Sequence, residues 1–167
     1  MKNNELVDFS IDKENNTVNV KRVFAAPISN VWAAWIEREL LDQWWAPKPW
    51  KSKTKSMDFK VGGRRLYAMV GPEGEEHWAI ADYTVISPKT NFKYLDAFCD
   101  SDGNITEDFP RSDWNVDFTE SGNTTIVYVT IKHENLSDLE TIIEMGFKEG
   151  FTMTLNELAN IFLSNQI

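Results

Sequence analysis

The sequence predicts an α+β domain in which one long C-terminal helix packs across a curved antiparallel sheet. Two patterns support this prediction. Residues 50–134 alternate between short apolar strands and turn residues, as an antiparallel meander does. Residues 137–163 instead repeat apolar side chains every three or four positions, as one face of a helix does. Such a face needs an apolar partner, and the sheet is the largest one available.

Length and composition fit one globular domain. The chain has 167 residues, of which 42% are hydrophobic and 26% charged. A domain of this size buries roughly 70% of the surface that its unfolded chain exposes, so it needs no disulfide or metal to fold. We expect a polar N-terminal tail at residues 1–16 and a single domain at residues 17–164. Monomer and homodimer both stay open.

A first strand and two short helices are expected before residue 50. Thr17–Phe24 alternates loosely between apolar and polar residues, and Pro27 ends this strand. Ser29 is the expected N-cap of the first helix. The second helix is expected at Glu39–Trp45, where two prolines follow and stop it.

The meander supplies the rest of a sheet of six or seven strands. Gly62-Gly63 interrupts it and indicates a bulge or a break. The later turns contain glycine, proline, aspartate and asparagine, which favour tight turns. The expected strands cover residues 57–61, 64–70, 77–86, 91–99, 112–119 and 124–132.

The C-terminal helix is expected to start at a capping box formed by Ser137 and Glu140. Two glycines, Gly146 and Gly150, lie one turn apart beside its apolar stripe and weaken the helix. They either allow a close approach to the sheet or leave space above it. The stripe consists of Leu139, Ile143, Phe147, Phe151, Leu155, Leu158 and Phe162.

The charge of the chain is unevenly distributed. The formal net charge is -9, which argues against nucleic acid and anionic membranes as partners. Residues 46–65 nevertheless contain seven basic residues against one acid, a local charge of +6. This basic strip is interpreted either as a lysine-protected sheet edge or as a surface for an anionic ligand or an acidic partner. It comprises Lys48, Lys51, Lys53, Lys55, Lys60, Arg64 and Arg65.

Cysteine usage and hydropathy predict a cytoplasmic protein. Cys99 is the single cysteine, so no internal disulfide is possible and a reducing compartment is expected. Residues 1–10 lack the apolar segment of a signal peptide. No apolar run approaches the roughly 20 residues that a membrane span needs.

Several short motifs resemble those of the activator of heat-shock-protein-90 ATPase homologue family, from residue 17 to about residue 163. This family belongs to the START and birch-pollen-allergen-like superfamily (SRPBCC), which has the helix-grip fold. The resemblance implies a sheet around the C-terminal helix and a cavity between them, which in many relatives binds lipids, sterols or polyketides. The motifs are Ala26-Pro27, Val31-Trp32, Trp44-Trp45, Gly62-Gly63, Tyr83 to Pro88, Thr125, and Met145 to Phe151 with Leu155 and Leu158.

Aromatic residues are the main candidates for a ligand site. Five of the seven tryptophans lie within residues 32–50, which is more aromatic surface than two short helices need. A filled core is the alternative interpretation. Phe151 stands where the family very often has Trp, which reshapes one wall of the expected cavity. The candidate walls are Trp35, Trp44, Trp45, Trp50, Phe59, Leu66, Trp78, Ile80, Phe147 and Phe151.

Few polar residues are candidates for chemistry. Arg64 or Arg65, which follow Gly62-Gly63, and His77 are possible anchors for a polar group of the ligand. His133 is interpreted as a loop residue and Cys99 as structural. No metal-binding or phosphate-binding motif is present, so we expect no metal and no cofactor.

These observations lead to three hypotheses. The first is a protein that holds a largely apolar small molecule between sheet and helix. The second is a protein-interaction module in which the basic strip docks on a chaperone ATPase, as the family name suggests. The third is an enzyme acting on a cyclic apolar substrate, with His77 and Asp82 as its polar pair.

Overall fold

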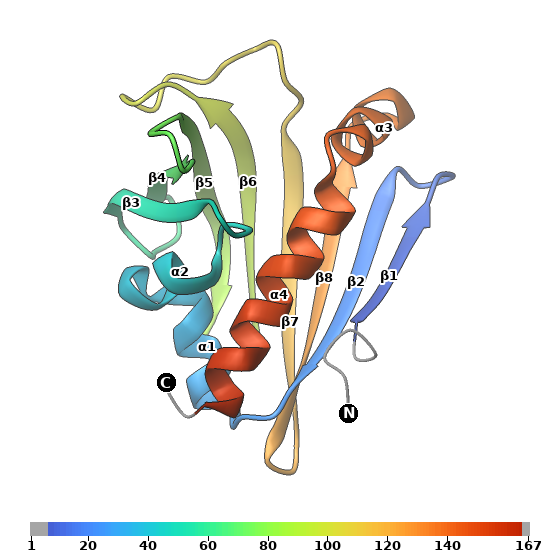
Figure 1. Ribbon diagram of the computed structural model, residues 1–167. Coiled ribbons are helices and arrows are strands. Elements are labelled where there is room, and N and C mark those ends of the chain that lie inside the picture. Colours follow the sequence, from blue (N-terminus) through green and yellow to red (C-terminus); the bar gives the residue numbers. More distant parts are fainter. Residues whose placement is uncertain (1–6, 165–167) are drawn as a thin grey trace.

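A curved antiparallel sheet wraps around the C-terminal helix in the computed structural model, which describes residues 7–164 (Figure 1). These residues form eight strands in the order β1-β2-β8-β7-β6-β5-β4-β3. The strands are β1 (Val7–Asp12), β2 (Thr17–Phe24), β3 (Lys51–Met57), β4 (Arg64–Val70), β5 (Glu76–Ser87), β6 (Asn91–Cys99), β7 (Ser112–Ser121) and β8 (Thr124–His133). The helices are α1 (Ile28–Ile36), α2 (Arg38–Trp44), α3 (Leu136–Glu144) and α4 (Phe147–Leu163). The predicted α+β helix-grip fold is confirmed.

Strand β1 is one strand more than predicted, because residues 7–12 are not a tail. They pair with β2 in register, from Val7 opposite Arg22 to Asp12 opposite Thr17. The hairpin closes through Asp12, whose carboxylate accepts hydrogen bonds from the backbone of Glu14 and Asn15. Its sequence alternates apolar Val7, Phe9 and Ile11 with polar residues, which is a strand pattern that the tail prediction overlooked. Residues 1–6 of the expected tail lie outside the described part of the chain.

Helices α1 and α2 lie close to their predicted positions, but the first starts earlier. Pro27, not Ser29, is the N-cap of α1, because its carbonyl accepts the N–H groups of Asn30 and Val31. The helices pack against each other and against the sheet through buried tryptophans.

Strand β3 also differs from the prediction, which placed a strand at residues 57–61. The strand is Lys51–Met57, and residues 58–63 form a tight loop. In this loop a Cβ on Gly63 would lie 2.1 Å from the carbonyl oxygen of Asp58, so only glycine fits there. Because β3 is an edge strand with exposed lysines at alternate positions, the structure supports the edge-protection interpretation of the basic strip.

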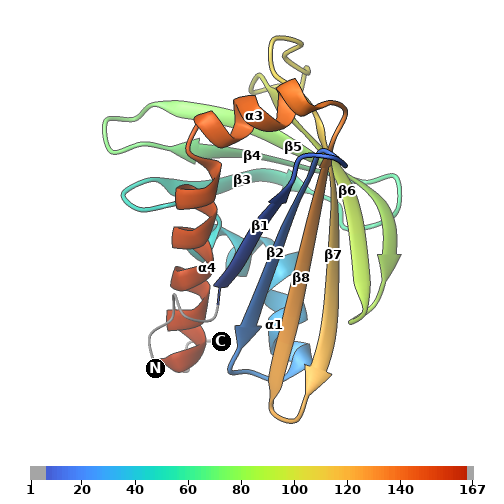
Figure 2. The same cartoon turned by 90° about the vertical axis from the view of Figure 1, so that its right-hand side faces the viewer.

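The predicted long C-terminal helix is two helices. Gly146 has a φ of 90°, a left-handed conformation that ends α3 and starts α4. Figure 2 shows α3 turned away from the axis of α4 and lying across one end of the sheet. The N-cap of α3 is Asn135, whose side chain accepts the N–H of Asp138 at 2.8 Å, so the predicted cap at Ser137 is wrong.

The two faces of the sheet have separate cores. The helix-facing side holds the large core, in which α4 packs through buried residues such as Leu155 and Leu158. On the opposite face, Leu66, Ile80 and Ala97 form a small cluster with Cys99. Side chains alternate along each strand, so every strand residue belongs to one of these two faces.

Alanine substitutions of Gly146 and Gly150 should change the free energy of unfolding in opposite directions. Gly146→Ala should lower the free energy of unfolding by about 1 kcal/mol, because a Cβ disfavours the left-handed conformation. Gly150→Ala should raise it by about 0.5–1 kcal/mol, because Gly150 is inside a helix and its Cβ would meet only Cγ of Pro47, 3.7 Å away. Urea unfolding of both variants tests the assignment, and effects of the same sign would contradict it.

Candidate ligand-binding site

A cavity of about 260 Å³ lies between the sheet and the start of α4. A cavity of about 150 Å³ holds benzene, so this one has room for roughly ten non-hydrogen atoms. The walls are mainly aromatic and apolar, and a few polar side chains reach them. The main lining side chains are Trp45, Tyr67, Met69, His77, Asp96, Ser112, Trp114, Ile131, His133, Ile142, Met145, Phe147, Phe151 and Thr154.

Four of the residues predicted for the site line this cavity: Trp45, His77, Phe147 and Phe151. The rings of Phe147 and Phe151 lie one turn apart on α4 and stack at 5.2 Å. Phe151 also meets the rings of Trp45 and Trp114 edge-on. These contacts form a continuous aromatic wall between α4 and the sheet.

Three predicted site residues lie instead in the filled core. Trp35 and Trp44 are 2% and 1% exposed, and their rings lie 4.7 Å apart. The indole of Trp44 donates to the carbonyl of Ala34 at 3.0 Å. Phe59 packs edge-on against Tyr83 at 4.8 Å. For these three aromatics the filled-core interpretation holds.

Trp50 lies next to the site but not among the cavity-lining residues. It is half-buried between α2 and β3, and its ring meets the His77 ring edge-on at 5.2 Å. The indole therefore covers the outer side of a side chain that does line the cavity.

The sheet residues predicted for the walls lie on the wrong face. Leu66, Trp78 and Ile80 belong to the small cluster behind the sheet, away from α4. Their neighbours Tyr67 and Ala79 face the cavity instead. A shift of one residue exchanges the two faces of a strand. Here both faces carry apolar side chains, so the sequence pattern did not distinguish them.

Arg64 is not an anchor in the cavity either. Its guanidinium donates to both oxygens of Asp82 on the outer face, at 2.6 and 3.1 Å, and Arg111 donates to Asp82 as well, at 3.0 Å. Burial alone would raise the pKa of Asp82, but these hydrogen bonds hold that pKa below its ordinary value. Asp82 and His77 lie on opposite faces of β5, so they do not form the polar pair that the enzyme hypothesis requires.

A row of polar residues that the sequence did not reveal crosses the sheet, and three of them, Asp96, Ser112 and His133, line the cavity. Arg65 is opposite Ala81, Ala81 opposite Asp96, Asp96 opposite Ser112, and Ser112 opposite His133. Directly paired residues point to the same face of a sheet. Four polar side chains on five adjacent strands therefore share the face that meets α4.

Asp96 is the acidic member of this row. One carboxylate oxygen accepts the backbone N–H of Ser112 at 2.7 Å, and the other accepts the indole N–H of Trp114 at 2.9 Å. Asp96 keeps some accessible surface because it faces the cavity, but protein surrounds it otherwise. This burial raises the pKa of Asp96 to about 6, against the lowering effect of its hydrogen bonds.

His133 ends the row and is not in a loop as predicted. It is the last residue of β8 and is 2% exposed. Its Nδ1 lies 3.3 Å from the hydroxyl of Ser112, while its Nε2 has no hydrogen-bond partner within residues 7–164. Burial lowers the pKa of His133, against the opposing charge of Asp138, so the ring is neutral at pH 7.

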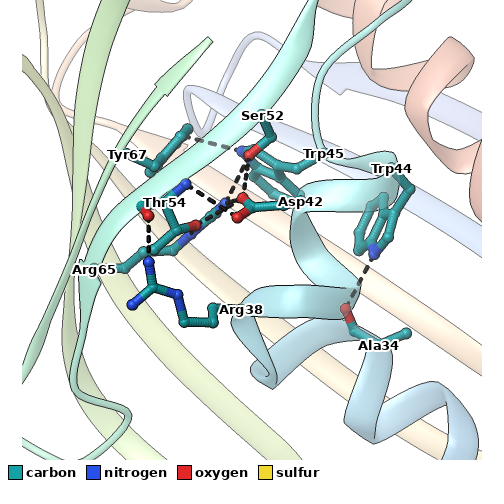
Figure 3. A network of polar contacts seen from close by, with 9 residues as sticks. All are labelled: Ala34, Arg38, Asp42, Trp44, Trp45, Ser52, Thr54, Arg65 and Tyr67. Atoms are coloured by element: carbon teal, nitrogen blue, oxygen red, sulfur yellow. Dashed lines mark hydrogen bonds and ion pairs between the residues drawn. The ribbon is translucent and has the colours of Figure 1, made fainter.

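A polar network fixes Arg65, at the other end of the row (Figure 3). Asp42 on α2 accepts hydrogen bonds from the hydroxyls of Ser52 and Thr54, at 2.8 and 2.7 Å. Arg65 is 3% exposed, donates to the Ser52 hydroxyl at 3.0 Å, and forms an ion pair with Asp42 at 3.5 Å. This network ties α2 to β3 and β4.

The same network positions two cavity walls. The guanidinium of Arg65 lies 3.9 Å from the ring centre of Tyr67, an attractive cation–π contact. The indole of Trp45 donates to the Tyr67 hydroxyl at 3.0 Å. Burial raises the pKa of Tyr67, so its hydroxyl is neutral at pH 7.

The missed residues left only a partial pattern in the sequence. Asp96 stands in one row with Phe92, Tyr94 and Phe98, where an acid among aromatics indicates a functional position. The other row of the same strand also carries apolar residues, among them Leu95 and Ala97, so neither row stood out. His133 continues the alternation of β8 by one step beyond the predicted strand end.

Residues 7–164 contain neither a metal-binding cluster nor a membrane-spanning helix. No three His, Cys, Asp or Glu side chains in this part of the chain lie close enough together to hold a metal ion. None of the helices described there is long and apolar enough to cross a membrane.

Comparison with known proteins identifies a family. The model of the family described as activator of Hsp90 ATPase homolog 1-like protein matches residues 25–162. Protein Ms6760 from Mycobacterium smegmatis is 28% identical, with a TM-score of 0.86 over 93% of this chain and 96% of that chain. A Staphylococcus epidermidis protein is 29% identical, with a TM-score of 0.81 and 95% of both chains covered. An Arthrobacter aurescens protein, at 24% identity, shares the fold, with a TM-score of 0.90 over 95% of this chain and 92% of that chain. No curated protein matches the chain.

Asp96 should make the protein more stable below its pKa than above it. The folded state holds the Asp96 proton up to about pH 6, whereas the pKa of an unperturbed aspartate is 3.8. The folded chain therefore binds more protons in this window, and its free energy of unfolding falls by about 3 kcal/mol as the pH rises through it. Asp96→Asn should abolish this contribution, as measured by urea unfolding from pH 4.5 to pH 7.5.

Asp82→Asn is the matched control, because the pKa of Asp82 is lowered. Asp82 stabilises the fold above its unfolded pKa and loses that effect as the pH falls, so this variant should change the pH profile in the opposite direction. A profile that Asp96→Asn leaves unchanged would refute the assignment of Asp96.

The buried ion pair should be sensitive to the loss of one partner. Asp42→Ala leaves the guanidinium of Arg65 buried without a carboxylate, which should cost about 3 kcal/mol of unfolding free energy. Asp42→Ala with Arg65→Met should recover much of that loss. Asp58→Ala, which removes an exposed ion pair with Lys60, should cost less than about 1 kcal/mol. Equal losses for Asp42→Ala and Asp58→Ala would contradict a structural role for the network.

Proposed function

Because the chain belongs to the activator of Hsp90 ATPase homolog 1-like family, whose fold supports a ligand-binding or interaction module, we propose that this protein binds a small, largely apolar molecule. The observation that supports this proposal is the cavity of about 260 Å³ between the sheet and α4. Ligand sites are typically concave, mainly apolar and lined by a few polar groups. This cavity has that composition.

The packing around the cavity favours a binding role over an accidental packing defect. Protein interiors are close-packed, and an apolar void of this size costs stability because its walls lose contacts. Gly150 lies in the cavity wall, at a helix position where a larger side chain would fill space and favour the helix. The chain thus keeps a space that a single substitution would reduce.

The chaperone-interaction alternative has less support from the surface. The basic strip is largely neutralised: Lys48 pairs with Glu157 at 3.2 Å, Arg64 with Asp82 at 2.6 Å, and Arg65 with Asp42. Lys55 and Lys60 also form ion pairs with nearby aspartates. Charges already paired within the chain attract an acidic partner weakly.

The enzyme alternative lacks its proposed pair, because His77 and Asp82 lie on opposite faces of β5. A cytoplasmic location stays part of the proposal. The single cysteine, Cys99, is buried and unpaired, as is usual in a reducing compartment.

Filling the cavity should stabilise the ligand-free protein but prevent ligand binding. Gly150→Leu should raise the free energy of unfolding of the ligand-free protein by about 1–2 kcal/mol, because it buries apolar surface and favours the helix. The same variant should lose the stabilisation that an added naphthalene derivative gives the wild type. For a ligand at a hundredfold excess over its Kd, that stabilisation is about 2.7 kcal/mol. Thermal unfolding with and without 2-fluoronaphthalene measures both effects.

Gly150→Ala is the matched control, because one methyl group leaves most of the cavity open. It should retain the ligand-induced rise in the unfolding temperature. If a panel of bicyclic apolar compounds gives no rise with the wild type, or an equal rise with Gly150→Leu, the proposed function is wrong.

A further inference from the structure

Asp96 places a negative charge in the cavity wall without a cationic partner. It is half-buried, lines the cavity and lies on the sheet face that meets α4, so its accessible surface faces the cavity. Its carboxylate forms no ion pair within residues 7–164. The donors that it accepts, the backbone N–H of Ser112 and the indole of Trp114, are neutral.

The carboxylates of the two neighbouring polar networks are compensated in a different way. Asp42 forms an ion pair with Arg65 at 3.5 Å, and Asp82 forms one with Arg111 at 3.0 Å. Arg111 also donates to the main-chain carbonyl of Asp96 at 2.9 Å. Burial nevertheless raises the pKa of Asp96 to about 6, although the charge of Arg111 acts in the opposite direction. The negative charge of Asp96 is therefore only partly compensated by the protein.

The surroundings of this carboxylate suit an organic cation. Among the described residues that line the cavity there is no lysine or arginine, and Asp96 is the one carboxylate. The rings of Trp45, Tyr67, Trp114 and Phe151 lie in the same wall. Aromatic faces attract cations, and cages of such rings bind quaternary ammonium groups. The formal net charge of -9 also attracts cations to the protein rather than anions.

Building on the proposed function, we infer that the bound molecule carries a positive charge and that its ammonium group lies against Asp96. The apolar part of the molecule then contacts the aromatic walls. A cation offsets the free-energy cost of the buried carboxylate, whereas a neutral molecule of the same shape does not. The ligand class is therefore amines and quaternary ammonium compounds of roughly ten non-hydrogen atoms.

The carboxylate is accessible to such a ligand in this structure. Exposed side chains, among them His77 and Met145, also line the cavity, so the cavity opens to solvent. An ionised carboxylate has about four acceptor positions, and the two N–H donors of Asp96 leave the others free.

Two compounds of equal shape test the inference. Phenyltrimethylammonium and tert-butylbenzene have the same number of non-hydrogen atoms and differ in charge. The fluorescence of the tryptophans gives the Kd of both for the wild type and Asp96→Asn. In Asp96→Asn the preference for the ammonium compound should fall at least about tenfold, because the attraction between two partly buried opposite charges is lost.

Asp113→Asn is the matched control. It changes the net charge by the same amount, but Asp113 alternates with Ser112 and lies on the face of β7 that points away from the cavity. This variant should keep the preference of the wild type. An equal loss in Asp113→Asn and Asp96→Asn would contradict a local role of Asp96.

The pH dependence of binding gives a second readout. The Kd of phenyltrimethylammonium should rise about tenfold from pH 7.5 to pH 4.5, because protonation removes the charge of Asp96, while the Kd of tert-butylbenzene stays constant. His77 and His133 also line the cavity and would repel a cation when protonated. Tyr67 stays neutral because burial raises its pKa, and the described lining residues of α3 and α4 carry no titratable group. Asp96→Asn keeps both histidines, so a pH dependence that is unchanged in this variant overturns the inference.

A measurement on the wild type does not depend on the folding of any variant. The pKa of Asp96, followed by ¹³C NMR of its carboxyl group, should fall when phenyltrimethylammonium binds, because a nearby positive charge favours the ionised form. It should rise when tert-butylbenzene binds, because a neutral apolar ligand displaces water from the carboxylate. Shifts in the same direction would refute the contact between the ammonium group and Asp96.

The outcomes also separate the two proposals. If both compounds bind and their Kd ratio is the same in the wild type and Asp96→Asn, the selectivity for cations is refuted while the binding function stands. If neither compound binds but the bicyclic apolar compounds do, the selectivity for cations is again refuted alone. If those compounds also fail to bind, both proposals fail.

Discussion

The in-register antiparallel pairing of the sheet is the constraint on which the rest of this structure depends. Each strand sends alternate side chains toward α4 and away from it, and directly opposed residues share a face. The pairing of Arg65, Ala81, Asp96, Ser112 and His133 therefore assembles one polar row from strands far apart in sequence. The same alternation fixes which aromatic residues meet α4. A one-residue shift in any strand would exchange the two faces.

The charges of the row are kept inside the protein by specific partners. Arg65 is held by Asp42 and by hydroxyl groups of β3, and it packs on Tyr67. Asp96 receives two N–H donors. Burying an unpaired charge is costly, so these contacts make a partly polar wall compatible with an apolar cavity. The wall thus combines aromatic surface for affinity with a few fixed polar atoms for selectivity.

The arrangement of the C-terminal helices creates the space for the cavity. Gly146 breaks the apolar stripe into two helices, so α3 turns across one end of the sheet while α4 continues along it. The cavity lies where the two helices meet, beside Phe147 and Gly150. A continuous helix would carry its side chains past this point in a straight line. The break therefore shapes the cavity, which α3 reaches through Ile142.

The sequence by itself determined the fold class, most strand positions and the aromatic character of the site, because these follow from local periodicity. It did not determine the faces of β4 and β5, where both rows are apolar, and so Leu66 and Ile80 were assigned to the wrong side. It also did not reveal that His133 lies in the cavity wall, because its neighbour Ser112 is 21 positions away in the sequence. Periodicity records what each segment prefers, whereas cross-strand pairing decides which residues meet. Only the tertiary structure joined Asp96, Ser112 and His133 into one site.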